Sequence, residues 1–249
     1  YVTGGDPAPK YTPKIVETLA NSGADIIEIG VPFSDPIADG PTIQAANTRA
    51  LKASTTPHKI FKIAKEAKRK VEKPIVLLTY YNLVFKMGVE DFLKNARRYQ
   101  VDGLIIPDLP VEEASKYKEL ADGQGVDTVF LATPATSTSR LKKIIAFTSG
   151  FLYLISIFGV TGTRDRLNEL TLQTILRLHP YTAGDVPMAV GFGISKPEHV
   201  KAVLRGGAEG AIVGSSFVDL IGRNLGDMNR ALKELEMMAR KLKMATADT

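Results

Sequence analysis

The stretch Gly23-Ala24-Asp25-Ile26-Ile27-Glu28-Ile29-Gly30 carries the pattern that decides the fold of this 249-residue chain. A glycine ends a helical segment, and an acidic residue then leads into a short apolar run typical of a buried parallel strand. The same kind of joint recurs at Val101-Asp102-Gly103, Gly125-Val126-Asp127 and Gly207-Ala208-Glu209. We expect the acidic residue of each joint to bond free backbone N–H groups before the strand. The recurrence predicts a repeated α/β unit.

Short apolar runs alternate with longer amphipathic segments along the whole chain. The expected strands are Val2-Thr3, Ile26 to Ile29, Ile75 to Leu78, Leu104 to Ile106, Thr128 to Leu131, Phe151 to Ile155, Met188 to Val190 and Ala211 to Val213. The expected helices lie near residues 10–22, 57–72, 89–99, 112–123, 138–148, 165–178, 196–205 and 228–243. About eight strand-helix units predict an α/β fold with a single (β/α)8 TIM barrel, and no linker divides residues 1–249. An open, doubly wound sheet is the alternative.

Composition excludes several classes of protein. The chain has no Cys and only three His, which rules out disulfides and thiolate sites and argues against a histidine-rich metal site, so no metal is expected. The first twenty residues lack a secretory apolar region, and no apolar run approaches a membrane span, which predicts a soluble, cytoplasmic protein. The net charge is +5. Its densest basic cluster, Lys65 to Lys73, follows helical spacing and indicates a solvated helix face rather than a nucleic-acid site.

The second expected strand places one carboxylate, Glu28, between isoleucines. Burying an ionised carboxylate without a partner is costly, so the residue has either a structural or a chemical reason to be there. The structural reason is an internal ion pair with a Lys or Arg. The chemical reason is proton transfer by a group whose pKa is raised by burial.

The loop after this strand, Val31 to Pro41, holds three prolines and a second carboxylate, Asp39, eleven residues after Glu28. Proline restricts φ and stiffens the loop, so Asp39 can be aimed back toward Glu28. Two carboxylates in different surroundings can divide acid and base roles. Alternatively, Asp35 and Asp39 stabilise turns through their side chains.

Glycine-rich segments near the end of the chain predict a phosphate site. Gly191 to Ser195 follows the seventh expected strand, and Val213 to Ser216 follows the eighth. Glycine permits close approach of backbone to ligand, and loops seven and eight of a barrel commonly bind phosphate. The sixth loop, Ile157 to Thr163, is expected to act as a lid whose Gly162 N–H completes the site. Packing alone is the alternative explanation for these small residues.

Several of these motifs together resemble one family. EIGVPFSDPIADGPTIQ (Glu28 to Gln44) is similar to the signature of the tryptophan synthase α subunit. YYNLVF, PDLPVEE, GVTG, GFGIS and VGSS follow in that family's order. The resemblance covers nearly the whole chain, although GVTG or GFGIS alone is weak evidence.

The resemblance implies a retro-aldol lyase that splits indole-3-glycerol phosphate into indole and glyceraldehyde 3-phosphate, in tryptophan biosynthesis. It implies that Glu28 shuttles protons and that Asp39 accepts the indole N–H. The implied phosphate ligands are Gly162, Gly193, Gly214 and Ser215. Tyr153 is implied to position Glu28 and the glycerol chain, and weaker candidates for substrate binding and lid closure are Tyr1, Tyr80, Thr161 and Phe192. Each of these aromatic residues is also typical of plain core packing.

The resemblance also implies a partner and no cofactor on this chain. The family works with a β subunit, as an α2β2 heterotetramer, and pyridoxal phosphate belongs to that subunit. The residues implied to face the partner are Ser34, Asp35, Pro36, Asn82 and Pro110. Two features depart from the family: the chain opens inside the motif of the first strand, so a short segment of the family lies before Tyr1, and Ile157 stands where some relatives carry an arginine.

Two other functions stay open. One is a non-catalytic α-like subunit that binds a phosphate ligand and activates a partner. The other is a different phosphate-binding barrel enzyme, such as an epimerase or a synthase. A metal-dependent epimerase would want His and Asp ligands at several strand ends, and this chain lacks them.

Overall fold

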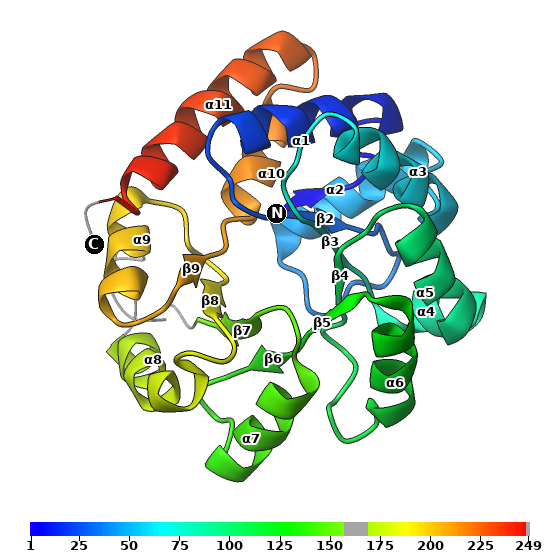
Figure 1. Ribbon diagram of the computed structural model, residues 1–249. Helices are drawn as coiled ribbons and strands as arrows, with labels where there is room; N and C mark the ends of the chain where they lie inside the picture. Colours follow the sequence, from blue (N-terminus) through cyan, green and yellow to red (C-terminus); the bar gives the residue numbers. More distant parts are fainter. Residues whose placement is uncertain (157–168, 248–249) are drawn as a thin grey trace. The chain divides into compact units, whose positions relative to one another are not determined.

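The computed structural model describes residues 1–156 and 169–247. Within these ranges parallel strands alternate with helices along the chain (Figure 1). The residues group into two compact units: unit 1 comprises Tyr1–Asp127 and Ser215–Arg240, and unit 2 comprises Thr128–Gly214 and Lys241–Thr249. The single domain expected from the sequence stays a prediction.

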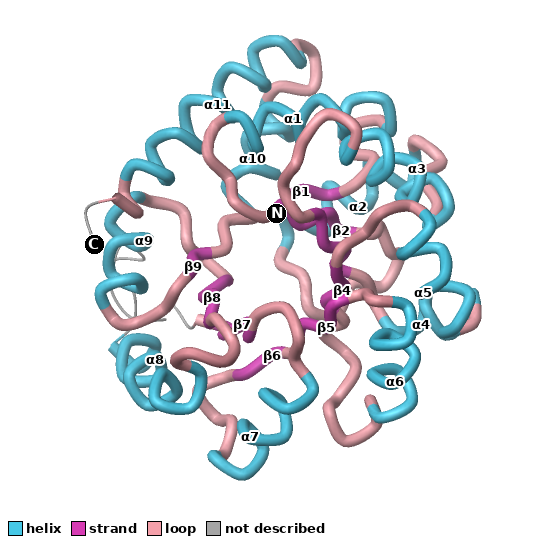
Figure 2. The backbone as a smooth tube through the Cα atoms, viewed as in Figure 1, coloured by secondary structure: helices cyan, strands magenta, loops and turns pink. Residues whose placement is uncertain are grey.

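The first sheet carries the expected carboxylate. Its strands, in spatial order, are β1 (Val2–Thr3), β2 (Ile27–Gly30), β3 (Ile75–Leu78), β4 (Gly103–Ile105) and β5 (Asp127–Val129), drawn in magenta in Figure 2. The pairs β1–β2, β2–β3 and β3–β4 are parallel, and Glu28 lies opposite Val76. Spatial order follows chain order, as expected when each strand is joined to the next by a helical crossover.

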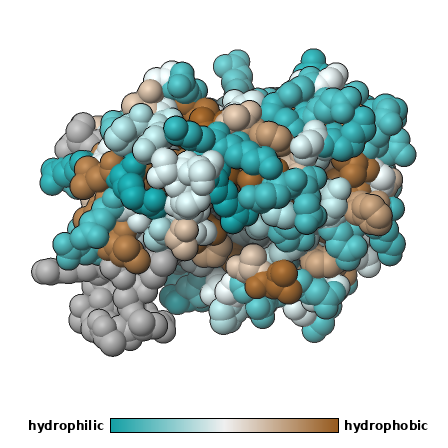
Figure 3. All heavy atoms as spheres, turned by 90° about the horizontal axis from the view of Figure 1, so that it is seen from below, coloured by the Kyte–Doolittle hydropathy of each residue, from teal (hydrophilic) through white to brown (hydrophobic). Residues whose placement is uncertain are grey.

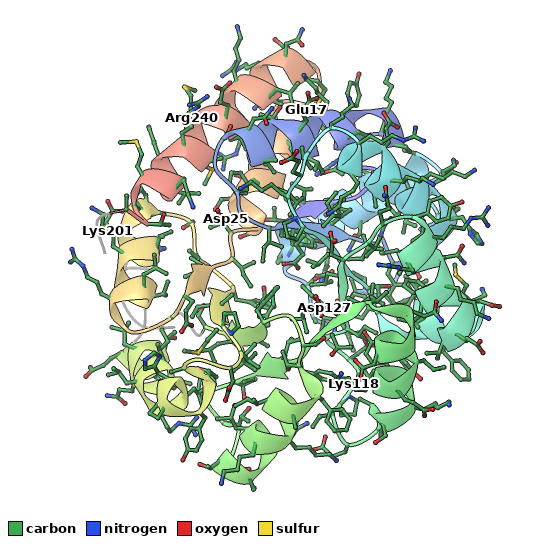
Figure 4. All side chains as sticks on the ribbon, viewed as in Figure 1. Glu17, Asp25, Lys118, Asp127, Lys201 and Arg240 are labelled. Atoms are coloured by element: carbon green, nitrogen blue, oxygen red, sulfur yellow. The ribbon has the colours of Figure 1, made fainter. Side chains whose placement is uncertain are left out.

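The helices of unit 1 are amphipathic, with charged residues on their exposed faces. They are the 3-10 helix Pro9–Tyr11, α1 (Thr12–Asn21), α2 (Pro41–Lys52), α3 (Pro57–Lys68), α4 (Tyr81–Met87), α5 (Val89–Arg98), α6 (Ser115–Gln124), α10 (Ser215–Arg223) and α11 (Met228–Met244), which runs on past Arg240. Phe61 and Phe92 are fully buried, with ring centroids 5.0 Å apart. Glu17 on α1 and Lys118 on α6 are charged residues of such helices (Figure 4).

Unit 2 is built around a second sheet. Its strands, in spatial order, are β6 (Leu131–Ala132), β7 (Leu152–Ile155), β8 (Met188–Gly191) and β9 (Gly210–Ala211), and all three neighbouring pairs are parallel. The helices between consecutive strands of this sheet are α7 (Thr138–Phe147), α8 (Glu169–Thr182) and α9 (Pro197–Arg205). Leu152, Leu154 and Val190 are fully buried, as strands covered by helices require.

At two of the predicted joints the acidic side chain bonds a backbone N–H at the start of a strand, although that strand is the neighbouring one rather than its own. The Asp102 carboxylate accepts a hydrogen bond from Ile75 N at 2.7 Å, and that of Glu209 accepts one from Met188 N at 2.8 Å. Each acidic residue therefore bonds the first N–H of the strand beside its own. Gly125 and Gly207 adopt φ values of +63° and +103°, conformations that glycine tolerates best.

Some predicted boundaries are wrong. The expected strand from Thr128 to Leu131 is divided into β5 and β6, with Phe130 between them. The helices α2, α4 and α10 were not predicted: α2 directly follows a proline-rich loop, and α4 has only seven residues. Pro41 occupies the first turn of α2, where its missing N–H has no intrahelical partner to lose.

The described helices differ in length or polarity from what a membrane span requires. Within the described ranges, every helix is too short or too polar to cross a bilayer. The face seen in Figure 3 is largely hydrophilic, with hydrophobic residues in small patches.

Candidate active site

Glu28 lies inside β2 and is only 5% exposed. No Lys or Arg among the described residues forms an ion pair with it, so the internal ion pair considered from the sequence is not found there. Burial raises the pKa of Glu28 to about 7; the positive charge of the Tyr1 amino group opposes this rise, and the negative charge of Asp39 adds to it. A carboxyl with this pKa exchanges protons readily near neutral pH.

Asp39 lies in the loop that connects β2 to α2 and is half-buried. Its carboxylate accepts a hydrogen bond from Asn47 Nδ2 at 3.2 Å. Burial raises the pKa of Asp39, while hydrogen bonds from Asn47 and Tyr80 oppose the rise. Because Asn47 is on α2 and Tyr80 follows β3, Asp39 is held from two elements and is not simply a turn residue.

Two tyrosines, Tyr80 and Tyr1, interact electrostatically with these carboxylates. Tyr80 is 2% exposed, accepts a hydrogen bond from Ala38 N at 3.0 Å, and packs its ring 5.3 Å from that of Phe33. Burial and the charge of Asp39 raise the pKa of Tyr80. Burial, then Asp39, also raises the pKa of Tyr1. Both hydroxyls therefore stay protonated and can donate hydrogen bonds.

The end of β2 leaves room for Tyr1 because it is glycine. A Cβ atom on Gly30 would lie 2.2 Å from the Tyr1 hydroxyl oxygen, closer than real atoms approach. The same hydroxyl is 3.4 Å from Thr3 Oγ1. The charge of Asp39 acts on Glu28, Tyr1 and Tyr80 alike, so these four side chains belong to one electrostatic group.

Sequence reasoning missed Asn47, which is 3% exposed, and the ion pair that anchors its helix. Arg49, two residues further along α2, donates to both oxygens of Asp6 at 2.7 and 2.8 Å. Asp6 is 1% exposed and follows β1. The sequence offered one clue to these contacts. Asn47 and Arg49 stand in an amphipathic run, Pro41–Lys52, that was not recognised as a helix.

In unit 2, Tyr153 on β7 and Phe192 after β8 lie side by side, with ring centroids 6.3 Å apart. Gly191 again leaves room for a tyrosine, since a Cβ there would lie 2.3 Å from the Tyr153 hydroxyl oxygen. Phe192 and Gly193 adopt φ values of +70° and +73°. Positive φ at Phe192 is uncommon for a residue with a side chain and marks a constrained loop.

The predicted phosphate residues are divided between the two units: Gly193 and Gly214 belong to unit 2, and Ser215 follows Gly214 directly in the chain. Gly214 belongs to unit 2, whereas Ser215 begins α10 and belongs to unit 1. Gly162, Thr161 and Ile157 lie outside the described residues. The complete phosphate site therefore stays a prediction.

The predicted partner residues lie on connected segments of unit 1. The hydrogen bond from Ala38 N to Tyr80 connects the loop after β2 to the start of α4. A second bond, from Tyr81 N to the Asp108 carboxylate at 2.8 Å, connects α4 to the segment before Pro110. Ser34, Asp35 and Asn82 are exposed, and Pro36 and Pro110 are half-buried. The neighbouring hydrophobic residues Ile37 and Phe85 are 83% and 70% exposed, a feature of surfaces that meet another protein.

A separate cavity of about 500 Å³ in unit 1 is lined by Lys68, Arg97, Asp102 and Asp127, among others. These residues lie at the starts of strands and the ends of helices. Glu28 and Asp39 lie toward the opposite ends of the strands, so this cavity is not the candidate site. No cluster of three or more potential metal ligands is found within residues 1–156 and 169–247.

Parallel strands alternating with helices, with a buried carboxylate inside β2 and a second carboxylate in the loop after it, are typical of an α/β enzyme of the TIM-barrel class. A model of the family described as "Tryptophan synthase alpha chain" matches residues 1–247. The chain therefore belongs to the tryptophan synthase alpha chain family, whose members are lyases of tryptophan biosynthesis.

Similar proteins come from archaea and plants. The alpha chain of Methanothermobacter thermautotrophicus is 43% identical over 245 residues, which is 98% of this chain and 90% of that one. The alpha chain of Arabidopsis thaliana is also 43% identical, over 98% and 88% of the two chains. A solved structure of the Pyrococcus furiosus α2β2 complex matches with a TM-score of 0.90 at 42% identity, over 96% and 94% of the two chains.

The raised pKa of Glu28 implies that the free energy of unfolding depends on pH in a defined direction. An acid with a pKa of about 7 when folded and an ordinary value of 4.5 favours the folded state less as pH rises through this interval. Glutamine has no charge to bury, so Glu28→Gln is expected to gain stability over wild type by about 3 kcal/mol between pH 4 and pH 8. Urea unfolding of both proteins at several pH values measures this gain. A difference that stays constant with pH would contradict the raised pKa.

Proposed function

We propose that this chain cleaves indole-3-glycerol phosphate into indole and glyceraldehyde 3-phosphate. The observation that carries the proposal is the burial of Glu28 inside β2, with no Lys or Arg ion-pair partner in the described ranges. This burial raises the pKa of Glu28 to about 7, and the charge of Asp39 adds to the rise. Family membership and the motif from Glu28 to Gln44 support the choice of substrate.

Glu28 moves the protons of the reaction. Its carboxyl group donates a proton to the indole ring carbon that bears the side chain, and the carbinol O–H gives up its proton. The carbon–carbon bond then breaks, its electrons return to the ring to form indole, and the carbinol carbon becomes the aldehyde. One proton is added and one is removed, so a single carboxyl near neutral pKa can serve both steps.

Asp39 stabilises the charge of the intermediate. Protonation of the ring carbon leaves the indole positively charged, and a carboxylate that accepts the indole N–H lowers the energy of that state. Asn47 and Tyr80 hold Asp39 for this contact. We assign Tyr1, Tyr80, Tyr153, Thr161 and Phe192 to substrate binding.

The phosphate group is assigned to backbone N–H groups and a hydroxyl. The proposed ligands are Gly162, Gly193, Gly214 and Ser215. Ser215 is the first residue of α10, and the free N–H groups of a helix start attract anions. The positive φ of Gly193 supports a backbone turned for close approach.

The proposed partner is a tryptophan synthase β subunit, in an α2β2 assembly like that of the Pyrococcus furiosus complex. Exposed Ile37 and Phe85 beside the predicted interface residues support this surface. Pyridoxal phosphate is expected on the partner, and a cytoplasmic location fits the biosynthetic role.

Indole formation from indole-3-glycerol phosphate, with and without a β subunit, tests the proposal. We expect the isolated chain to release indole and the β subunit to increase the rate. Binding of a phosphate ligand with no indole release in either condition would favour the non-catalytic α-like subunit instead.

A further inference from the structure

The loop from Gly191 to Ser195 is tied down at its start by Ser156, the residue after β7. Ser156 donates to the Gly191 carbonyl twice, from its backbone N at 2.8 Å and from its Oγ at 2.6 Å. The same hydroxyl also lies within hydrogen-bond distance of the Phe192 carbonyl. Ser156 is 5% exposed, so little water competes for these bonds. The carbonyls that precede Gly193 are therefore fixed from one side.

The end of the same loop is held by His199, the third residue of α9. Ser195 N donates to His199 Nδ1 at 3.3 Å, and His199 is 3% exposed. This bond resembles the contact in which a side chain in the first helical turn reaches back to a free N–H before the helix. The N-cap residue, Lys196, makes no side-chain cap bond of its own, so His199 supplies the polar anchor at this helix start.

The backbone between these anchors needs such support. Phe192 and Gly193 both have positive φ, and a residue with a side chain keeps this conformation only where its surroundings enforce it. Tyr153 covers Gly191 closely and limits the loop's start further.

We propose that Ser156 and His199 are positioning residues that hold the loop so that Gly193 N–H meets the substrate phosphate. This inference rests on the proposed function, because it concerns the phosphate-bearing part of that substrate. Neither residue touches the ligand; both act through the loop backbone. Their loss weakens the binding of phosphate-bearing ligands and leaves the binding of indole unchanged.

The reverse reaction, in which indole and glyceraldehyde 3-phosphate condense, measures the binding of indole and the binding of the phosphate-bearing substrate separately, because each is then an independent substrate with its own KM. His199→Leu removes the acceptor, and we expect the KM for glyceraldehyde 3-phosphate to rise about tenfold because Ser195 N–H loses its buried partner. The KM for indole is expected to stay within about twofold, since an indole has no phosphate. His199→Gln retains an acceptor oxygen and is expected to recover most of the loss. Ser156→Ala, a smaller change, is also expected to raise the KM for glyceraldehyde 3-phosphate and to leave the KM for indole unchanged.

His179→Leu provides a matched control in unit 2. Its Nδ1 is buried and has no hydrogen-bond partner among the described residues, so this change removes no bond to the loop. We expect both KM values to match wild type. Hydrogen exchange at Ser195 N–H gives a readout independent of turnover: it speeds up in His199→Leu and not in His199→Gln.

The outcomes separate the inference from the function. Unchanged Ser195 exchange, equal rises in both KM values, or no recovery with glutamine would overturn the inference. If His199→Leu does not fold, Ser156→Ala still decides it: a KM for glyceraldehyde 3-phosphate equal to that of wild type would overturn the inference. If wild type neither condenses the two substrates nor binds glyceraldehyde 3-phosphate, the proposed function fails, and the proposed phosphate role of the loop falls with it.

Discussion

Glu28→Gln is expected to lower the rate of indole formation by about a thousandfold, the typical loss when a general acid–base group is removed. Glutamine keeps the size and burial of the side chain but carries no exchangeable acidic proton. Because Glu28 is 5% exposed, water has little access to replace it. The loss is expected in kcat rather than in KM, since the proton is transferred only after the substrate is bound.

Two controls make this result specific. Glycerol 3-phosphate is expected to bind Glu28→Gln as it binds wild type, which shows that the site is intact. Asp25→Asn neutralises an exposed carboxylate three residues earlier and is expected to leave the rate unchanged. Turnover by Glu28→Gln above about a tenth of wild type would refute the proton-transfer role, because general acid–base catalysis contributes far more than tenfold.

Asp39→Asn is expected to lower the rate of indole formation by about a hundredfold or more, within the range seen when one charge-stabilising group is removed. The amide still fills the space and can accept a hydrogen bond, but it offers no negative charge to the protonated ring. The same change removes the charge that helps to raise the pKa of Glu28. We therefore expect the pKa of Glu28 to fall in this variant.

Asn47→Ala is the matched test of how Asp39 is held. The carboxylate remains but loses the 3.2 Å bond from Asn47, so a smaller loss of about tenfold is expected. Steady-state assays of indole formation by wild type, Asp39→Asn and Asn47→Ala measure the two losses of rate. If Asn47→Ala lost as much activity as Asp39→Asn, orientation rather than charge would be the main contribution of Asp39; a wild-type rate in Asp39→Asn would remove its role altogether.

The sequence was sufficient to single out Glu28 as a buried carboxylate, because a carboxylate in an apolar strand is rare and costly. The same pattern located the strand itself to within one residue, Ile26 to Ile29 expected and Ile27–Gly30 observed. The joint at Glu209 was also predictable, since a glycine turn followed by an acidic residue before an apolar run has a local physical meaning. At Asp102 the glycine follows the acidic residue, and Gln100 takes the positive φ instead.

Contacts between residues far apart in the chain could not be predicted from local sequence patterns. Asn47 reaches Asp39 only because α2 folds back over the loop, and that helix was hidden by three prolines nearby. The Asp6–Arg49 pair joins residues 43 positions apart. The anchoring of the Gly191 loop by Ser156 joins residues 35 positions apart and depends on the parallel pairing of β7 and β8. Only the assembled sheets bring such groups together.

The most direct test of the role of Glu28 follows the proton itself. In D2O, with glycerol 3-phosphate bound, wild type is expected to exchange deuterium into the reacting ring carbon of indole at a rate far above the uncatalysed one, as observed by NMR. Glu28→Gln is expected to exchange at the background rate, whereas Asp25→Asn exchanges like wild type. Equal exchange by wild type and Glu28→Gln would show that another group moves the proton and would contradict the proton-transfer role of Glu28.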